Sequence, residues 1–338
     1  MFAGNGSARN DVPILDSKEL QKGLRQLKVG YPVAGLAISP DSSLLATCGR
    51  GPLRAVEFPD RSARIVLWDL TKLLPVHVLD GSKDCLSVAF SPDGKLVAGG
   101  RTDRGARVWE VKTGLDKYTL FDKSEARDDA YVDSIQFTAD SKKVVYGGRS
   151  RARVFDLESG QLLWGFNDER GRGNKISIKP NTSILATAGQ GEGILLFDIE
   201  TGKRLREIKF EIKTELEGTG KFVWHIGYSL DGEYLACVDM NSTVWLFDTQ
   251  HYDGTPVWRN DPNDLCRAFA FSPDSKTIAL AGKTIQLFDV ASRELVLKLP
   301  GGQRLALSPN GKTLVTTAPV LHLNIWDLPT VLRAHAGD

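Results

Sequence analysis

Apolar and polar positions alternate along most of the chain in short runs that end at turn signals. The pattern is clearest in residues 85–120, where the first run is followed by Ser91-Pro92-Asp93-Gly94. Proline presets such a turn, aspartate bonds its own backbone and glycine accepts a positive φ. The runs are apolar on both faces, which is typical of a sheet covered on both sides. We predict four strands, termed a to d, at 85–90, 95–99, 106–110 and 117–120.

The turn tetrad recurs seven times, so the four-strand unit is a repeat. The second tetrad positions are Pro40, Pro92, Ala139, Pro180, Leu230, Pro273 and Pro309. The mean step between them is about 45 residues, the period of a four-stranded propeller blade. An aromatic residue followed by an acidic one ends strand c in every repeat. These pairs are Trp68-Asp69, Trp109-Glu110, Phe155-Asp156, Phe197-Asp198, Phe247-Asp248, Phe288-Asp289 and Trp326-Asp327.

The paired tetrads and aromatic-acid motifs resemble the WD40 family, in a bacterial-type, degenerate form. The resemblance covers about residues 24–328. It implies an all-β fold, a seven-bladed β-propeller of four-stranded antiparallel blades. The Gly-His dipeptide that opens many repeats of the family is absent from all seven repeats. We therefore expect the His-centred hydrogen-bond network of the family to be missing, and blade rigidity to come mainly from packing.

The two ends of the repeat array predict how the ring closes. After Asp327 no fourth strand is recognisable, whereas residues 24–29 precede the first strand a. A strand at 24–29 would complete the seventh blade and remove the open edges. We expect an N-terminal tail at 1–20, one propeller at 24–328 and a C-terminal tail at 329–338.

Composition agrees with one large core and narrows the functional classes. The 338 residues are 41% hydrophobic and carry a formal net charge of +1, which creates no overall field for nucleic acid or an anionic membrane. There is no apolar run of 18 residues, so we expect no membrane span. The four cysteines form no CxxC pair, and we expect buried, reduced thiols and a cytoplasmic setting.

Three connections are longer than their counterparts, and all three belong to one rim of the ring. They lie at 50–61, 121–131 and 210–222, between strands b and c or between strand d and the next strand a. Insertions on one face of a repeat array often mark its binding face. Neutral drift of surface loops is the alternative interpretation.

Arginines of the first three b–c connections form a predicted arc on this rim. They are Arg50, Arg54, Arg61, Arg101, Arg104, Arg149 and Arg151. Arginine binds carboxylate and phosphate in a two-pronged geometry, so the arc predicts docking of an acidic or phosphorylated segment. Acidic residues within 122–129 on the same rim could instead neutralise the arc.

Aromatic side chains near this rim add candidate anchors for a partner. They are Tyr31, Tyr131, Phe222 and Trp224, of which Tyr131 and Trp224 are included in the predicted partner-binding site. Tryptophan, tyrosine and arginine are the usual anchors of protein interfaces. Packing between blades is the alternative role, especially for Trp224.

No motif in the chain indicates catalysis, so we predict no catalytic residues, no metal and no cofactor. The histidines His77, His225, His251, His322 and His335 show no ligand spacing. We predict a monomeric, non-catalytic scaffold that binds a protein or peptide through the b–c and d–a connections. Two alternatives are a lactonase-like propeller hydrolase with a metal at the channel mouth, and single-stranded nucleic-acid binding. The near-neutral charge disfavours the second.

Overall fold

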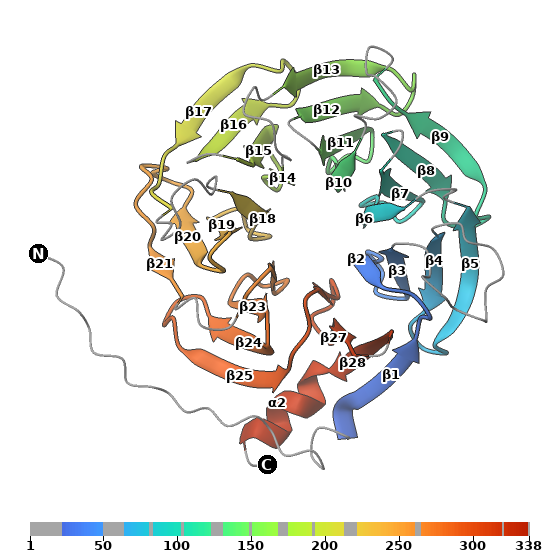
Figure 1. Cartoon of the computed structure of the whole chain (residues 1–338), viewed down its shortest axis with the longest axis vertical. Helices are drawn as coiled ribbons and strands as arrows, with labels where there is room; N and C mark the ends of the chain where they lie inside the picture. The colour runs from blue at the N-terminus through green and yellow to red at the C-terminus, as the bar shows by residue number, and fades with distance from the viewer. Residues whose placement is uncertain are drawn as a thin grey trace, which may run out of the picture.

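The computed structural model describes residues 22–49, 64–80, 84–102, 105–122, 131–148, 151–167, 175–190, 193–212, 222–260, 265–319 and 321–336. Within these ranges the chain forms seven antiparallel sheets of four strands each, arranged as a ring around a central axis (Figure 1). The all-β, seven-bladed propeller predicted from the repeat is confirmed.

Each sheet is one blade, and its first strand, strand a, lines the axis. The inner strands are β2 (Val33–Ile38), β6 (Cys85–Phe90), β10 (Val132–Phe137), β14 (Lys175–Ile178), β18 (Val223–Tyr228), β22 (Ala268–Phe271) and β26 (Leu305–Leu307). Strands b are β3 (Leu44–Gly49), β7 (Leu96–Arg101), β11 (Lys143–Gly148), β15 (Ile184–Ala188), β19 (Tyr234–Asp239), β23 (Thr277–Ala281) and β27 (Thr313–Ala318).

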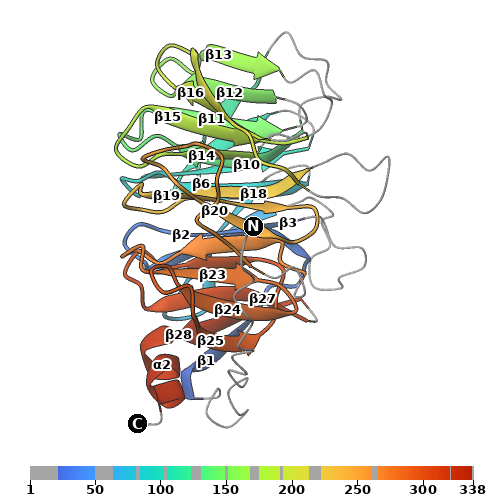
Figure 2. The same cartoon turned by 90° about the vertical axis from the view of Figure 1, so that its left-hand side faces the viewer.

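Strands c follow, and the outer edge of the ring is formed by strands d. Strands c are β4 (Arg64–Asp69), β8 (Ala106–Glu110), β12 (Arg151–Asp156), β16 (Ile194–Asp198), β20 (Val244–Asp248), β24 (Thr284–Asp289) and β28 (His322–Asp327). Strands d are β5 (Leu74–Asp80), β9 (Asp116–Leu120), β13 (Leu162–Asn167), β17 (Arg204–Ile208), β21 (Trp258–Arg259), β25 (Leu295–Pro300) and, for the seventh blade, β1 (Leu24–Lys28). Seen from the side, the sheets lie one beside another (Figure 2).

The N-terminal strand closes the ring, as the sequence predicts. Strand β1 pairs antiparallel with β28, with Leu24 opposite Trp326 and Lys28 opposite His322. Leu27 is buried in the cluster that joins the seventh blade to the first. Because β1 is far in sequence from β26, β27 and β28, the seventh blade joins the first blade to the last and closes the ring.

A C-terminal helix was not anticipated, since a tail was expected at 329–338. Helix α2 (Leu328–Ala336) begins directly after β28, and proline is tolerated in its first turn. Val331 is buried in the core of the seventh blade. It also lies against Gly23, where an added Cβ would be 2.9 Å from Val331 Cγ2. The helix therefore packs against the segment that leads into the closing strand.

Blade rigidity comes mainly from packing, but three blades also contain a buried hydrogen bond from a strand-c tryptophan; in the fifth blade Trp245 Nε1 donates to Asp239 Oδ2 at 2.9 Å. In the first blade Trp68 Nε1 donates to Thr47 Oγ1 at 2.8 Å, and Tyr31 forms a short hydrogen bond to the same oxygen. In the seventh blade Trp326 Nε1 donates to Thr316 Oγ1 at 3.1 Å. These hydrogen bonds contain no histidine, and they add to the packing that was expected to supply most of the rigidity.

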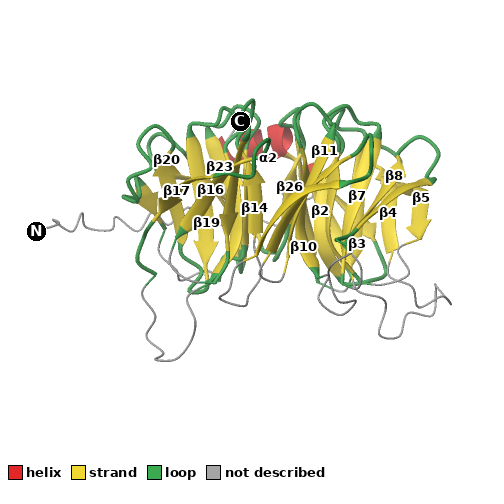
Figure 3. Cartoon of the chain, turned by 90° about the horizontal axis from the view of Figure 1, so that it is seen from above, coloured by secondary structure: helices red, strands yellow, loops and turns green. Residues whose placement is uncertain are grey.

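The two rims of the ring differ in the connections that they carry. Strands run from rim to rim (Figure 3), so the a–b and c–d turns share one rim and the b–c and d–a connections share the other. The a–b turns satisfy their own polar groups; Ser39 Oγ, for example, donates to Asp41 Oδ1 at 2.5 Å. We call the opposite rim, formed by the b–c and d–a connections, the connection rim.

Candidate partner-binding site

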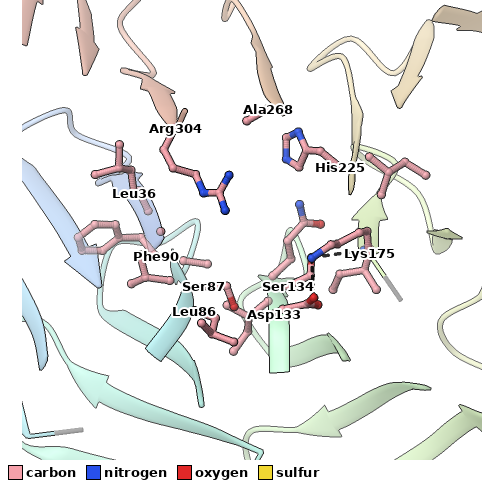
Figure 4. Close-up of a pocket in the computed structure, with 18 of the residues that line it drawn as sticks. Leu36, Leu86, Ser87, Phe90, Asp133, Ser134, Lys175, His225, Ala268 and Arg304 are labelled. Atoms are coloured by element: carbon pink, nitrogen blue, oxygen red, sulfur yellow. Dashed lines mark hydrogen bonds and ion pairs between the residues drawn. The ribbon is translucent and has the colours of Figure 1, made fainter. Parts of the chain in front are cut away.

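A cavity of about 1130 Å³ runs along the axis of the propeller and is lined by the inner strand of every blade (Figure 4). Strand a begins at the connection rim and ends at the a–b turn. Residues at the start of each inner strand therefore surround the channel mouth at the connection rim.

One repeat position supplies most of the polar groups of this mouth. It is the residue five places before the second tetrad position, and its seven occupants are Gly35, Ser87, Ser134, Lys175, His225, Ala268 and Arg304. These residues are far apart in sequence but meet because each blade repeats the same path. Six of them face the same space in Figure 4.

The inner strands are tied to one another by side chains of the neighbouring blade. Ile176 N donates to Ser134 Oγ at 3.3 Å, and Tyr228 N donates to Ser177 Oγ at 3.0 Å. Strand a has no neighbouring strand on the side that faces the channel, so its N–H groups on that side need such hydrogen-bond acceptors. Much of the polar lining therefore has a structural role.

An ion pair crosses the third and fourth blades at the mouth. Lys175 Nζ lies 2.6 Å from Asp133 Oδ2, with both side chains largely buried. The second carboxylate oxygen, Asp133 Oδ1, is buried and has no hydrogen-bond partner among the described residues. Lys175 is thus neutralised inside the fold, and Asp133 retains one acceptor.

His225 is a neutral member of the mouth. Its Nδ1 accepts a hydrogen bond from Phe269 N at 3.3 Å, which links the fifth blade to the sixth. Burial, reinforced by the charges of Lys175 and Arg304, lowers the pKa of His225 to about 3. The imidazole is therefore uncharged at neutral pH, because protonation would add a desolvated cation beside two others.

Arg304 is anchored at one side of its guanidinium group and open at the other. Its Nε donates to Ala34 O at 2.9 Å and its Nη1 to Gln303 O at 3.2 Å. Its Nη2 makes no hydrogen bond with the described residues, and the side chain points into the channel in Figure 4. Burial, and then the charge of Arg267, lower the pKa of Arg304 from its ordinary value.

Trp224 and Arg267 form the exposed lip of the mouth. The guanidinium group of Arg267 lies over the Trp224 indole, 5.3 Å from its centroid, and Phe222 meets the same indole edge-on at 4.6 Å. Trp224 is 39% exposed. The predicted packing role and the predicted partner role are therefore compatible, because one face of the ring packs while part of it stays accessible.

Most of the predicted arginine arc cannot be placed. Arg50, Arg54, Arg61, Arg104 and Arg149 lie outside the described residues.

The remaining members of the predicted site differ in exposure. Arg101 was expected in a loop but is the last residue of β7 and is only 4% exposed, because the strand continues two residues past the predicted end. Arg151 opens β12 and is half-buried. Tyr131 is half-buried and lines the channel. Of the four rim aromatics, Tyr31 is buried in the core instead.

The acidic residues expected to neutralise the arc are represented by Asp122 alone, since 123–130 lie outside the described residues. Its carboxylate lies 2.9 Å from Arg153 Nε, and that guanidinium group also donates to Phe166 O and Asn167 Oδ1. Arg153 is 4% exposed. This pair therefore belongs to the fold and does not face a partner.

Arg267, Arg304 and Lys175 were missed by sequence reasoning. The signal for two of them was present: aligning the repeats on their tetrads puts Lys175, His225 and Arg304 at one position. Arg267 occupies the position before it, as do Asp133 and Trp224. These residues lie in or directly before the inner strands that line the axis, and not in the long connections.

Other chemistry-bearing groups of the described part are structural. All four cysteines are free and buried, as expected, and burial together with neighbouring Cys85 raises the pKa of the Cys48 thiol. The described residues contain no cluster of three or more His, Cys, Asp or Glu side chains suited to a metal ion. They also contain no helix with the length and apolar character needed to cross a membrane.

Comparison with known proteins points to one family. Residues 73–110 match the family model described as "WD domain, G-beta repeat". The chain is 29% identical to WD repeat-containing protein SL1-17 of Schistosoma mansoni over 44% of its own length and 46% of that protein. It is 24% identical to Actin-interacting protein 1 of Drosophila melanogaster over 73% of its own length and 41% of that protein.

A third relative extends the match over most of the propeller. The chain is 24% identical to Apoptotic protease-activating factor 1 of Danio rerio over 86% of its own length and 26% of that protein. The chain thus spans less than half the length of these relatives. Given seven four-stranded blades, the matching family model and these WD-repeat relatives, the chain belongs to the WD40-repeat family of β-propellers.

Proposed function

We propose that the chain is a non-catalytic scaffold that binds a protein or peptide partner at the connection rim. The observation that supports this most is the lip of the channel mouth, where exposed Arg267 lies on partly exposed Trp224. These are the residue types that anchor protein interfaces. Two relatives, Actin-interacting protein 1 and Apoptotic protease-activating factor 1, are named for an action on another protein.

The contrast between the two rims also supports the proposal. Polar groups of the a–b turns are used within the turns; Ser272 Oγ donates to Asp274 Oδ1 at 2.6 Å, and Ser308 Oγ to Asn310 Oδ1 at 2.7 Å. At the connection rim, by contrast, Arg304 bonds within the described residues through Nε and Nη1, and its side chain points into the channel (Figure 4). The described part of this rim therefore offers a charged donor to a partner.

Charge reversal on each rim tests the proposal. Arg50→Glu with Arg149→Glu changes two b–c connections, and Arg101 is left intact because its burial would confuse folding with binding. Lys95→Glu with Lys312→Glu is the matched control in exposed a–b turns of the other rim. Thermal melting of both proteins establishes that each stays folded. Only the first pair should lose partners captured from a lysate of the source organism.

Two results would favour the alternatives. Stoichiometric metal in untagged protein, lost together with a hydrolase activity, would support a propeller enzyme. Retention of single-stranded nucleic acid that weakens steeply with salt would support nucleic-acid binding. If both charge-reversed proteins capture the same partners as the parent, the binding surface lies elsewhere on the ring.

A further inference from the structure

The outer strand of the first blade, β5, exposes aliphatic side chains on the outer wall of the ring (Figure 1). A further exposed leucine follows in the c–d turn of the second blade, and this turn lies against β5, since His77 Nε2 is 3.2 Å from Lys112 O. Each of these aliphatic side chains is at least 46% exposed. We call them the outer patch: Leu74, Val76, Val78 and Leu115.

The aliphatic character of β5 is particular to this blade. Register shifts against strand c leave one residue without a partner in five outer strands, namely Val76, Lys117, Leu163, Leu205 and Val296. In β5 that residue and the residues two places before and after it are all aliphatic. Each of the other four strands has a charged or amide side chain among the same three positions: Lys117, Gln161, Lys203 and Glu294. Edge strands usually carry such side chains, and a cluster of exposed aliphatic residues typically marks a surface that another molecule covers.

The outer patch is unsuited to pairing with an additional β-strand. Pro75 has no N–H group to donate, and the β-bulge at Val76 interrupts the register between β4 and β5. Both features prevent the edge of a sheet from pairing with another chain. A partner must therefore bind through its side chains, as an amphipathic helix does when its apolar face lies on an apolar surface.

Exposed basic side chains surround the outer patch, namely Lys72, Lys112 and Lys117. The first of them lies 3.9 Å from the carboxylate of Asp69, in a surface pair that contributes little. The other two form no ion pair with a described residue, and the neighbouring carboxylate of Asp116 lies 3.3 Å from Arg107 Nε instead. The charge around the patch therefore favours a partner with carboxylates beside its apolar face.

We propose that the outer patch binds an amphipathic helix of a partner protein, with aliphatic residues on one face and Asp or Glu residues beside them. At about 3.3 Å per residue, Leu74 to Val78 spans about 13 Å, which corresponds to two or three helical turns. Aliphatic residues at positions i, i+3, i+4 and i+7 of a helix would cover this length. Since β5 is the outermost strand of its blade, this is a second interaction surface, separate from the connection rim.

The test uses three synthetic helical peptides of about 15 residues, a length of four turns. The first carries leucines on one face and glutamates beside them; the second has lysines in place of the glutamates, and the third has glutamines in place of the leucines. Fluorescence anisotropy measures their binding to the full chain at two salt concentrations. We expect the acidic peptide to bind best and to weaken with salt, because the lysines supply part of its affinity.

Variants of the patch assign the binding to named residues. Val76→Ser combined with Val78→Ser should weaken binding of the acidic peptide about tenfold, since two apolar contacts are lost. The matched control is Leu205→Ser, which changes the equivalent bulged residue of the fourth blade and should leave the affinity unchanged. Lys112→Gln combined with Lys117→Gln should reduce the salt dependence. Thermal melts establish that each variant stays folded.

Several results would overturn the proposal. They are the absence of saturable binding of the acidic peptide up to about 1 mM, equal binding of the acidic and basic peptides, and an equal effect of the patch and control substitutions. A dimer in analytical ultracentrifugation that Val76→Ser with Val78→Ser dissociates would mean that a second copy of the chain covers the patch. None of these results bears on the connection rim, which the charge-reversal experiment examines separately.

Discussion

The guanidinium group of Arg267 rests on the indole ring of Trp224, 5.3 Å from its centroid, and this contact joins the fifth and sixth blades at the channel mouth. Neither side chain is buried, so the contact depends on two accessible groups holding each other in place. The indole gives the guanidinium group of Arg267 a contact at the channel mouth. Removing the ring should therefore disorganise the mouth without opening the core.

Trp224→Ala should weaken partner capture, whereas Trp224→Phe should preserve much of it. An exposed cation–π contact contributes about 0.5–1 kcal/mol, so the alanine variant should lose no more than roughly that in stability. Thermal melting and quantitative pull-down of both variants test this. An early melt of Trp224→Ala would mean that the ring serves blade packing instead.

Thr47→Val should destabilise the first blade strongly. It removes the partner of Trp68 Nε1 and one partner of the Tyr31 hydroxyl, which also donates to Thr47 O at 3.4 Å, and an orphaned buried polar group costs about 1–3 kcal/mol. Thr316→Val is the matched variant in the seventh blade, where a single indole loses its partner. Urea unfolding should rank Thr47→Val as the more costly change; equal costs would mean that Tyr31 contributes nothing.

Closure of the ring by β1 predicts a sharp difference between two deletions. Removing residues 1–15 should leave the melting temperature unchanged, while removing 1–30 deletes the closing strand and should prevent folding. Within the strand, Leu27→Ala should cost about 2–4 kcal/mol because Leu27 is buried between blades. A protein lacking residues 1–30 that kept its melting temperature would contradict the pairing of β1 with β28.

Helix α2 should contribute to stability although it lies outside the repeats. A stop after Asp327 removes Val331, which is 1% exposed and packs on the seventh blade. Val331→Ala should cost about 1–3 kcal/mol in urea unfolding. Leu332→Ala, at an exposed position of the same helix, is the control and should cost less than about 0.5 kcal/mol.

His225 should make the protein less stable as the pH falls from about 6.5 toward 3. Its folded pKa is about 3, so in this window the unfolded chain binds a proton that the folded protein excludes. Stability should decrease by up to about 1.4 kcal/mol for each pH unit of acidification.

Urea unfolding between pH 6.5 and 5 isolates this effect. Hydrogen bonds from Ser39 and Ser272 lower the pKa values of Asp41 and Asp274, so their contribution is lost only at lower pH. His225→Asn keeps an acceptor for Phe269 N and should flatten the slope, whereas exposed His251→Asn should not. An unchanged slope in His225→Asn would show that another group titrates.

The repeat, the strands and the closing strand could be predicted from the sequence, because their causes are local. Ser91-Pro92-Asp93-Gly94 turns the chain by its own backbone preferences, and the 45-residue period forces one blade per repeat. Counting the strands of each repeat was enough to assign Leu24–Lys28 to the seventh blade. The predictions were wrong where local signals are weak. Strand β7 extends to Arg101, beyond its predicted end, and helix α2 begins directly after a strand, without a motif that indicates it.

Only the tertiary structure decided which side chains meet. Arg267 and Arg304 lie 37 residues apart in sequence, and Trp224 lies 43 residues before Arg267, yet the closed ring brings all three to one mouth. Tyr31 likewise finds Thr47 only because strands β2 and β3 pair. Charge balance in the channel depends on these meetings, since Asp133 neutralises Lys175 across two blades, whereas Arg267 and Arg304 form no ion pair with another described residue. A linear pattern specifies the blades, but their contacts across the axis exist only after the ring has closed.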